Sequence, residues 1–185
     1  DSFDISWVEL YPDKPWNFNN DISMNPNLDI SWIQKYPDQN WNWWTIGHSN
    51  NFNISWLEYL QHVLVDDFWN SLGFHERFSL DWVRKYPNCP WNWDSINKNF
   101  NFLRKFKIEY YEEFPLIPWN WILICKLAQD FDMEWPLKYP NLSWSFSQIS
   151  KNKNLTLNWL HKIPYPYFQI KFKDNTNVVD KEWDT

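Results

Sequence analysis

The sequence predicts an all-α protein, a solenoid of short helix-turn-helix repeats of about 25 residues. An aromatic or aliphatic residue followed by proline recurs, with prolines at positions 12, 37, 87, 115, 140 and 164. The intervals between these prolines are 25, 50, 28, 25 and 24 residues, so the interval of 50 holds two repeats. Aromatic residues also recur at fixed positions, five residues before and four and six residues after each of these prolines, except that Ile170 stands six residues after Pro164. Periods of this length are typical of repeat arrays.

The aromatic positions predict the core. Each repeat places one aromatic residue, usually Trp, in a first helix and a pair of aromatics around an Asn or Ser at the start of a second helix. One repeat buries too little apolar area to offset the conformational entropy of about 25 ordered residues, so the repeats must stack on their neighbours. The predicted structural core is Trp7, Trp16, Trp32, Trp41, Trp43, Trp82, Trp91, Trp93, Trp119, Trp121, Trp135, Trp144 and Trp159.

Polar residues predict where the helices begin. A Ser precedes the Trp of several first helices, and Glu three residues after Ser6 completes a capping box. The proline of each repeat then ends the first helix. In the second helix we expect the central Asn or Ser to be the N-cap, with the first Trp packed against an Ile four residues after the cap. The predicted caps are Ser6, Ser31, Ser55, Asp81 and Asn158 for first helices, and Asn42, Asn92, Asn120 and Ser145 for second helices.

The repeat array is predicted to cover residues 1–164 in about seven repeats. Its irregular third repeat, residues 53–78, lacks the proline, so its first helix is expected to continue towards Leu64. Phe68-Trp69-Asn70 is expected to replace the second aromatic cluster there. Residues 165–185 form a degenerate C-terminal segment, part of which alternates like a short strand, and a further repeat is expected to begin in it. Because the chain starts without Met and stops inside a repeat, we expect it to be a segment of a longer protein.

Composition argues against several classes of protein. The chain has 17 Lys and Arg against 23 Asp and Glu, and a formal net charge of −6 opposes binding to the phosphates of a nucleic acid. The mean hydropathy of −0.67 and the lack of a long apolar run predict no membrane insertion. The 2 Cys form neither a CxxC pair nor a disulfide scaffold, which favours a reducing compartment.

No pattern typical of catalysis is present. The 4 His lack the spacing of a zinc motif, and 2 Gly in the whole chain leave no glycine-rich phosphate loop. Adjacent acids such as Asp66-Asp67 are more typical of a solvated turn than of a catalytic pair. We therefore predict a protein that is not an enzyme and has no catalytic, metal-binding or cofactor-binding residues and no small-molecule cofactor. Carbohydrate binding by exposed Trp and Asn is the alternative from another class, although the fixed phase of the Trp residues favours a core role.

Partner proteins are the expected ligands, because a solenoid leaves the positions between its structural columns free to vary. The third repeat breaks the pattern without an evident structural gain, which makes it the best candidate for a specialised contact. Decay of the repeat would explain the departure as well. The candidate partner-binding residues are Tyr59, Gln61, His62, Asp66, Asp67 and His75.

The recurring motif Ile-Ser-Trp-x-x-x-Tyr-Pro-Asp-x-x-Trp-Asn-Trp, cleanest at residues 31–44, resembles the tryptophan-rich repeat proteins encoded by giant DNA viruses of amoebae. Nearly the whole chain shares the motif, except residues 57–80 and 165–185. The resemblance implies a viral protein and brings no catalytic residues. We expect it to be a minor structural (capsid) component of the virion that binds other virion proteins. The alternative is an adaptor that engages host proteins in the host cell cytoplasm.

Overall fold

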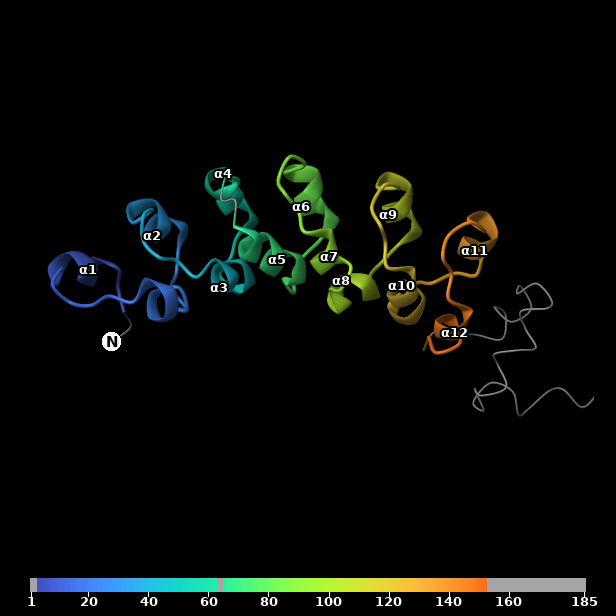
Figure 1. The fold of residues 1–185 in the computed structure, drawn as a ribbon, viewed down its shortest axis with the longest axis horizontal. Coiled ribbons are helices and arrows are strands. Elements are labelled where there is room, and N and C mark those ends of the chain that lie inside the picture. The colour runs from blue at the N-terminus through green and yellow to red at the C-terminus, as the bar shows by residue number, and fades with distance from the viewer. Residues whose placement is uncertain (1–2, 63–64, 153–185) are drawn as a thin grey trace, which may run out of the picture. The chain divides into compact units, whose positions relative to one another are not determined.

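The computed structural model describes residues 3–62 and 65–152, and its regular elements there are helices, with no strand among them (Figure 1). The all-α prediction is confirmed for this part of the chain. Two compact bodies are formed, Asp1–Ile96 and Asn97–Thr185. Within the described residues, every helix is too short or too polar to cross a bilayer. Predicted core residue Trp159, predicted cap Asn158 and segment 165–185 lie outside the described residues.

In the first body, each repeat pairs a first helix with a second helix, and in every repeat except the third a proline turn ends the first helix. The first helices are α1 (Ser6–Leu10), α2 (Ile30–Lys35), the 3-10 helix η2 (Ile54–Trp56) continued by α4 (Leu57–Leu60), and α6 (Leu80–Lys85). The second helices are the π-helix η1 (Phe18–Ile22), α3 (Trp43–His48), α5 (Asp66–Phe74) and α7 (Trp93–Ile96). Among the second helices, α5 contacts both α3 and α7.

The second body continues the same local pattern. Its first helices are α9 (Ile108–Glu113) and α11 (Glu134–Lys138), and its second helices are α10 (Trp121–Leu127) and α12 (Phe146–Ile149). One helix has no counterpart in the predicted repeat, namely α8 (Phe100–Arg104), which the Asn99 side chain caps by accepting from the Phe102 N–H at 3.1 Å. It falls in the longest single interval between prolines, 28 residues, and it packs against α10.

The first helix of the third repeat is shorter than predicted. Helix α4 ends at Leu60 and does not continue towards Leu64. The Gln61 side-chain amide donates to the Glu58 carbonyl oxygen at 3.3 Å, and that carbonyl is the acceptor that the next helical residue would need. The predicted replacement for the aromatic cluster lies in α5, where Phe68 and Trp69 are both buried.

The side chains that accept from the first-turn N–H groups of the first helices lie two residues before the predicted serines. Asp29 Oδ1 accepts from the Ser31 N–H at 2.9 Å. Asp4 accepts in the same way from Ser6 at 2.8 Å, and Asn53 from Ser55 at 3.0 Å. Ser6, Ser31 and Ser55 therefore lie in the first turn, as Asp81 does in α6, and the prediction that they are caps is wrong. Where Asp and Ser compete, the carboxylate is the stronger acceptor, and its charge favours the helix N-terminus.

The caps of the second helices lie where the sequence places them. The side chains of Asn42, Asn92 and Asn120 accept from backbone N–H groups three residues later, at 3.0, 3.0 and 3.1 Å. Ser145 stands at the N-cap of α12, but its hydroxyl makes no capping hydrogen bond. The Gln148 N–H, which that hydroxyl would need as its donor, is bonded to the Ser145 carbonyl oxygen at 2.9 Å.

The predicted Trp core is buried to different degrees. Trp32, Trp41, Trp91, Trp119, Trp121 and Trp135 are buried, and Trp16, Trp43, Trp82, Trp93 and Trp144 are half-buried. Trp7 is the exception, because 38% of its surface is exposed, so its assignment to the core is wrong. In the next repeat, Trp32 is covered by Phe3 of the preceding one, whose ring centroid is 5.7 Å away. Phe3 also contacts Trp7, at 5.9 Å between ring centroids, but as a residue of the same repeat.

A further column, made of Phe at all but one position, could not be recognised from the spacing of the Trp residues alone. Its members stand four residues before the Trp or Tyr of each first helix: Phe3, Leu28, Phe52, Phe78, Phe106 and Phe131. Phe52 lies between Trp56 of its own repeat and Trp82 of the next, with ring centroids 5.6 and 5.9 Å away. Phe106 lies between Tyr110 and Trp135 in the same way, at 5.7 and 6.3 Å. Phe52 and Phe106, like Phe3 between Trp7 and Trp32, therefore pack between neighbouring repeats.

Candidate interaction surface

The first Trp of each pair closes the turn between the two helices of its repeat. Trp41 Nε1 donates to the carbonyl oxygen of Tyr36, the residue before the proline, at 2.9 Å. The same bond, 2.7 to 3.0 Å long, recurs at Trp16, Trp91, Trp119 and Trp144. A Phe in this column would pack but could not donate, since only the indole carries an N–H. The bond explains why Trp is the residue used, and it occupies the polar atom that a ligand would otherwise use.

A column of small or polar residues stands near the end of the second helices or just after it: Ser23, Gly47, Gly73, Asn97, Cys125 and Ser150. Both glycines of the chain stand in it. A Cβ on Gly73 would lie 2.6 Å from Ser95 Cβ of the following repeat. At two other members of the column, the side chain instead accepts a hydrogen bond from the backbone N–H of the residue that caps the next second helix. Ser23 Oγ accepts from the Asn42 N–H at 2.9 Å, and Asn97 Oδ1 accepts from the Asn120 N–H at 3.0 Å.

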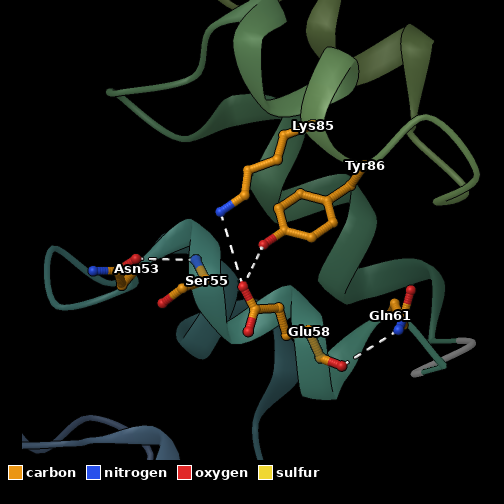
Figure 2. A network of polar contacts seen from close by, with 6 residues as sticks. All are labelled: Asn53, Ser55, Glu58, Gln61, Lys85 and Tyr86. Carbon is orange, nitrogen blue, oxygen red and sulfur yellow. Dashed lines mark hydrogen bonds and ion pairs between the residues drawn. The ribbon is translucent and has the colours of Figure 1, made fainter.

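Ion pairs join first helices of neighbouring repeats, always from an acid to the Lys-Tyr-Pro segment of the next repeat. Lys35 Nζ lies 2.7 Å from Glu9 Oε1, and Lys138 Nζ lies 2.7 Å from Glu112 Oε1. Figure 2 shows the third case, in which Lys85 Nζ lies 3.9 Å from Glu58 Oε1. The signal was present in the sequence, because Lys-Tyr-Pro occurs only at 35–37, 85–87 and 138–140. The acids belong to the first, third and fifth repeats, so this contact groups the repeats in pairs.

The adjacent tyrosine contributes to two of these contacts. Tyr86 donates its hydroxyl to Glu58 Oε1 at 3.4 Å (Figure 2), and Tyr139 donates to Glu112 Oε1. The hydrogen bonds from Lys138 and Tyr139 lower the pKa of the Glu112 carboxyl. The hydrogen bond to Glu112, followed by that to Tyr139, raises the pKa of Lys138. Both groups are thus held in their charged forms, although they lie at the surface.

Five of the six candidate partner-binding residues are exposed in the third repeat. Tyr59 has 43% of its surface exposed, and Gln61, His62, Asp66 and Asp67 are also exposed. Tyr59 follows Glu58 in α4, so it stands beside the ion pair with the next repeat. Asp66 and Asp67 form the first turn of α5, where negative charge is favoured by the helix dipole. That role gives the acid pair a structural explanation.

His75, the sixth candidate, is fully buried, so its assignment to a binding surface is wrong. Its Nε2 lies 3.1 Å from the Ser49 carbonyl oxygen, and its Nδ1 accepts from the Arg77 N–H at 3.0 Å. Both ring nitrogens are therefore satisfied in the neutral form with the proton on Nε2. Burial lowers the pKa of His75. The sequence could not reveal this, because the partner Ser49 belongs to the preceding repeat.

A metal-binding cluster is not found in the described part of the chain: nowhere in residues 3–62 and 65–152 do three or more His, Cys, Asp or Glu residues gather around one point. The Cys125 thiol is buried, and burial raises its pKa to about 11. Comparison with family models, curated proteins and solved structures finds no match to this chain.

Proposed function

We propose that this chain is a non-enzymatic scaffold that binds other proteins, built as an α-solenoid in which the repeats stack in sequence. The observation that carries the proposal is how the repeated residues are used. Repeated Trp, Asn and small residues are engaged in closing turns, capping helices and joining neighbouring repeats. The remaining exposed positions differ from repeat to repeat, which is the layout of proteins that recognise partners along an extended surface.

The third repeat is the proposed contact region for the partner. Tyr59 is an exposed aromatic residue, and aromatic residues with a polar group are enriched at protein interfaces. Exposed Gln61 and His62 follow it, and Asp66 and Asp67 add negative charge on the next helix. The Glu58–Lys85 pair beside Tyr59 supports this proposal, because it ties α4 to α6 and so limits how far the exposed residues can move.

The test of this surface is photo-cross-linking. Tyr59 is replaced by a photoreactive phenylalanine analogue in the full chain, and the same analogue is placed at Leu116 as the control. Leu116 is 94% exposed and lies in a turn outside the third repeat. We expect one protein to be cross-linked reproducibly from position 59 and not from position 116. Equal labelling from both positions, or labelling from neither, would contradict the proposal.

We further propose that the scaffold is a minor structural component of a giant-virus particle, with other virion proteins as partners. The motif of residues 31–44 supports this assignment through its likeness to the tryptophan-rich viral repeats. An adaptor that engages host proteins is the alternative. Mass spectrometry of purified particles separates the two: absence of the protein from the particles, together with its presence in infected cells, would remove the virion role and favour the adaptor.

Carbohydrate binding is the rival from another class, and two exposed indoles favour it. Trp7 and Trp44 have 38% and 41% of their surfaces exposed. The Asn of each Trp-Asn-Trp motif caps a helix, however. Its side-chain oxygen Oδ1 accepts from a backbone N–H and is therefore not free to bind a sugar. A glycan array tests this alternative. Sugar binding that Trp7→Ala or Trp44→Ala abolishes, with the circular dichroism spectrum retained, would favour carbohydrate binding over the protein scaffold.

A further inference from the structure

An aromatic platform lies at the junction of the second and third repeats, on the contacting helices α3 and α5 (Figure 1). It consists of Trp44 and His48 from α3 and Phe74 from α5. Trp44 stacks on His48, with ring centroids 6.2 Å apart and 12° between the planes, and its centroid lies 6.4 Å from that of Phe74. Trp44 keeps 41% of its surface exposed, His48 is exposed and Phe74 is half-buried. Three rings from two repeats therefore form one surface that is open to solvent.

Two glycines hold the helices that carry the platform close together. His48 directly follows Gly47, and Phe74 directly follows Gly73. A Cβ on Gly47 would lie 3.0 Å from the Phe68 carbonyl oxygen of α5, so the two helices leave no room for a side chain there. The rings are thus attached to a closely packed pair of helices. A ligand would bind a surface that is already formed, which lowers the entropic cost of binding.

The repeat pattern does not require these rings. The residues at the repeat position of Trp44 are Asn19, Asp94, Ile122 and Ser147, and those at the position of His48 and Phe74 are Met24, Lys98, Lys126 and Lys151. The platform is therefore particular to this junction. Its neighbours on both sides belong to the same body, because the first repeat precedes it and α5 also contacts α7 of the fourth. Further repeats stacked at either end of the chain would not cover it.

The body that carries the platform is strongly acidic. Residues 1–96 contain 13 Asp and Glu against 5 Lys and Arg, a formal charge of −8. Glu76, two residues after Phe74, is exposed. The neighbouring cation, Arg77, is engaged within the chain, because its guanidinium donates to the carbonyl oxygens of Asn50 and Phe52 at 2.8 and 2.7 Å. The platform thus lies on a body whose net charge attracts cationic ligands.

We propose that the platform binds an arginine-rich segment of a partner protein, with one guanidinium group stacked on the Trp44 ring. A guanidinium group is planar and weakly hydrated, and the face of an indole attracts it. Charge complementarity selects this occupant, since a second copy of the chain would bring a net charge of −6 to a body that is itself acidic. The inference deepens the proposed scaffold function and rests on it, because it names the chemistry of the partner.

The test is titration of the full ¹⁵N-labelled chain with a short synthetic peptide in which arginine alternates with serine, followed by NMR. The ionic strength is physiological, because a Debye length of about 8 Å then limits long-range attraction by the acidic body. We expect saturable shifts of the Trp44 indole N–H and of the His48 and Phe74 amides. A peptide with lysine in place of arginine has the same charge and should bind about threefold more weakly, because an ammonium group is more strongly hydrated and does not stack.

Variants of the chain locate the contact. Trp44→Ser should weaken binding of the arginine peptide about fivefold, through loss of the cation–π interaction. Trp7→Ser is the matched control and should leave binding unchanged, because Trp7 is 38% exposed on the same acidic body and lies outside the platform. Circular dichroism verifies that both variants are folded. The proposal is overturned if the arginine peptide does not bind, if the lysine peptide binds equally well, or if the two variants bind alike.

Measurements on the chain alone test the other possible occupants. A soluble paramagnetic agent should broaden the Trp44 indole N–H signal, and protection from it would show that another segment of the chain covers the platform. Sedimentation should give a monomer, and a dimer that Trp44→Ser dissociates would assign the platform to a second copy. A sugar that shifts the Trp44 signal where the arginine peptide does not would assign it to carbohydrate. Each of these three results would overturn the arginine-rich partner.

Failure of this inference and failure of the proposed contact in the third repeat give different results. Absence of peptide binding, with a specific cross-link still formed from position 59, would remove this inference and leave the scaffold function standing. Absence of that cross-link, with the arginine peptide still bound at Trp44, would contradict the contact at Tyr59 and leave the platform as the contact region.

Discussion

Glu112 and Lys138, 26 residues apart in the sequence, join the first helices of two consecutive repeats through a 2.7 Å contact between Oε1 and Nζ. Tyr139 donates its hydroxyl to the same carboxylate. Equivalent acid–Lys pairs stand at Glu9–Lys35 and Glu58–Lys85. A charged contact thus recurs at every second junction between repeats, on top of the aromatic packing beneath it.

Glu112→Gln should lower the melting temperature slightly, and more at low than at high salt, because the pair lies at the surface and is screened. The pKa of Glu112 is lowered in the folded state, so its contribution is present above the ordinary Glu value of about 4.3 and is lost as pH falls through the folded pKa. Thermal melts at two ionic strengths and at several pH values measure the effect. An identical loss for Glu109→Gln, on the same helix, would show that the ion pair is not its cause.

His75 should make stability depend on pH between about 7 and 5. Its pKa is lowered mainly by burial, so the unfolded chain binds the proton more tightly than the folded one does. Stability is therefore full above the unfolded value of 6.5 and falls as the pH drops below it. Denaturant unfolding across this range should give a free energy of unfolding that rises with pH. His75→Gln should reduce this dependence on pH, and His62→Gln, at an exposed histidine, should leave it in place.

Gly73→Ala should destabilise the protein by about 1–3 kcal/mol, because the new methyl group would overlap Ser95 of the next repeat. The sign of the change in the free energy of unfolding shows whether the site is crowded. Ala is the better helix former by about 0.8–1 kcal/mol, so the same change in an uncrowded helix would stabilise. Urea unfolding measures the difference. Asp67→Ala, in the exposed first turn of the same helix, should lose only a favourable interaction with the helix dipole. A stabilised Gly73→Ala variant would refute close packing of the second helices.

Trp91→Ala should cost about 3–5 kcal/mol, as expected for deletion of a buried aromatic side chain. Trp91 is 7% exposed, and its Nε1 donates to the Tyr86 carbonyl oxygen at 2.9 Å. Trp91→Phe keeps most of the packing but removes the donor, so part of the loss should remain, about 1 kcal/mol or more. Gln39→Ala, at an exposed position, should be nearly silent. Equal unfolding midpoints for all three variants would rule out the role of the indole.

The two cysteines should differ in reactivity towards iodoacetamide. Burial raises the pKa of Cys125 to about 11, so only about a thousandth of it is thiolate at pH 8. Cys89 is half-buried, and burial raises its pKa as well. We expect Cys89 to be alkylated first and Cys125 only when the chain unfolds, as followed by peptide mass spectrometry. Early modification of Cys125 in the folded protein would contradict its burial.

Features that depend on a few neighbouring residues could be predicted from the sequence. Proline ends the first helices, and Asn42 and Asn120 cap the second ones, because each effect acts within one turn of the backbone. The caps of the first helices were predicted two residues too late, since Asp29 and Ser31 are both suitable caps and the local pattern cannot choose between them.

Except for α8 and the end of α4, the helices, their approximate limits and the positions that supply aromatic residues could be predicted, because backbone sterics and the period of apolar residues are local properties. Which of those side chains are covered depends on contacts between repeats. Trp7 is exposed and Trp32 buried although they occupy the same repeat position and both contact Phe3. For Trp32 this ring comes from the preceding repeat, whereas for Trp7 it comes from its own repeat. His75 is buried because Ser49 lies 26 residues before it in the sequence and beside it in space. Burial in this protein depends on the neighbouring repeat, and a single repeat does not contain that information.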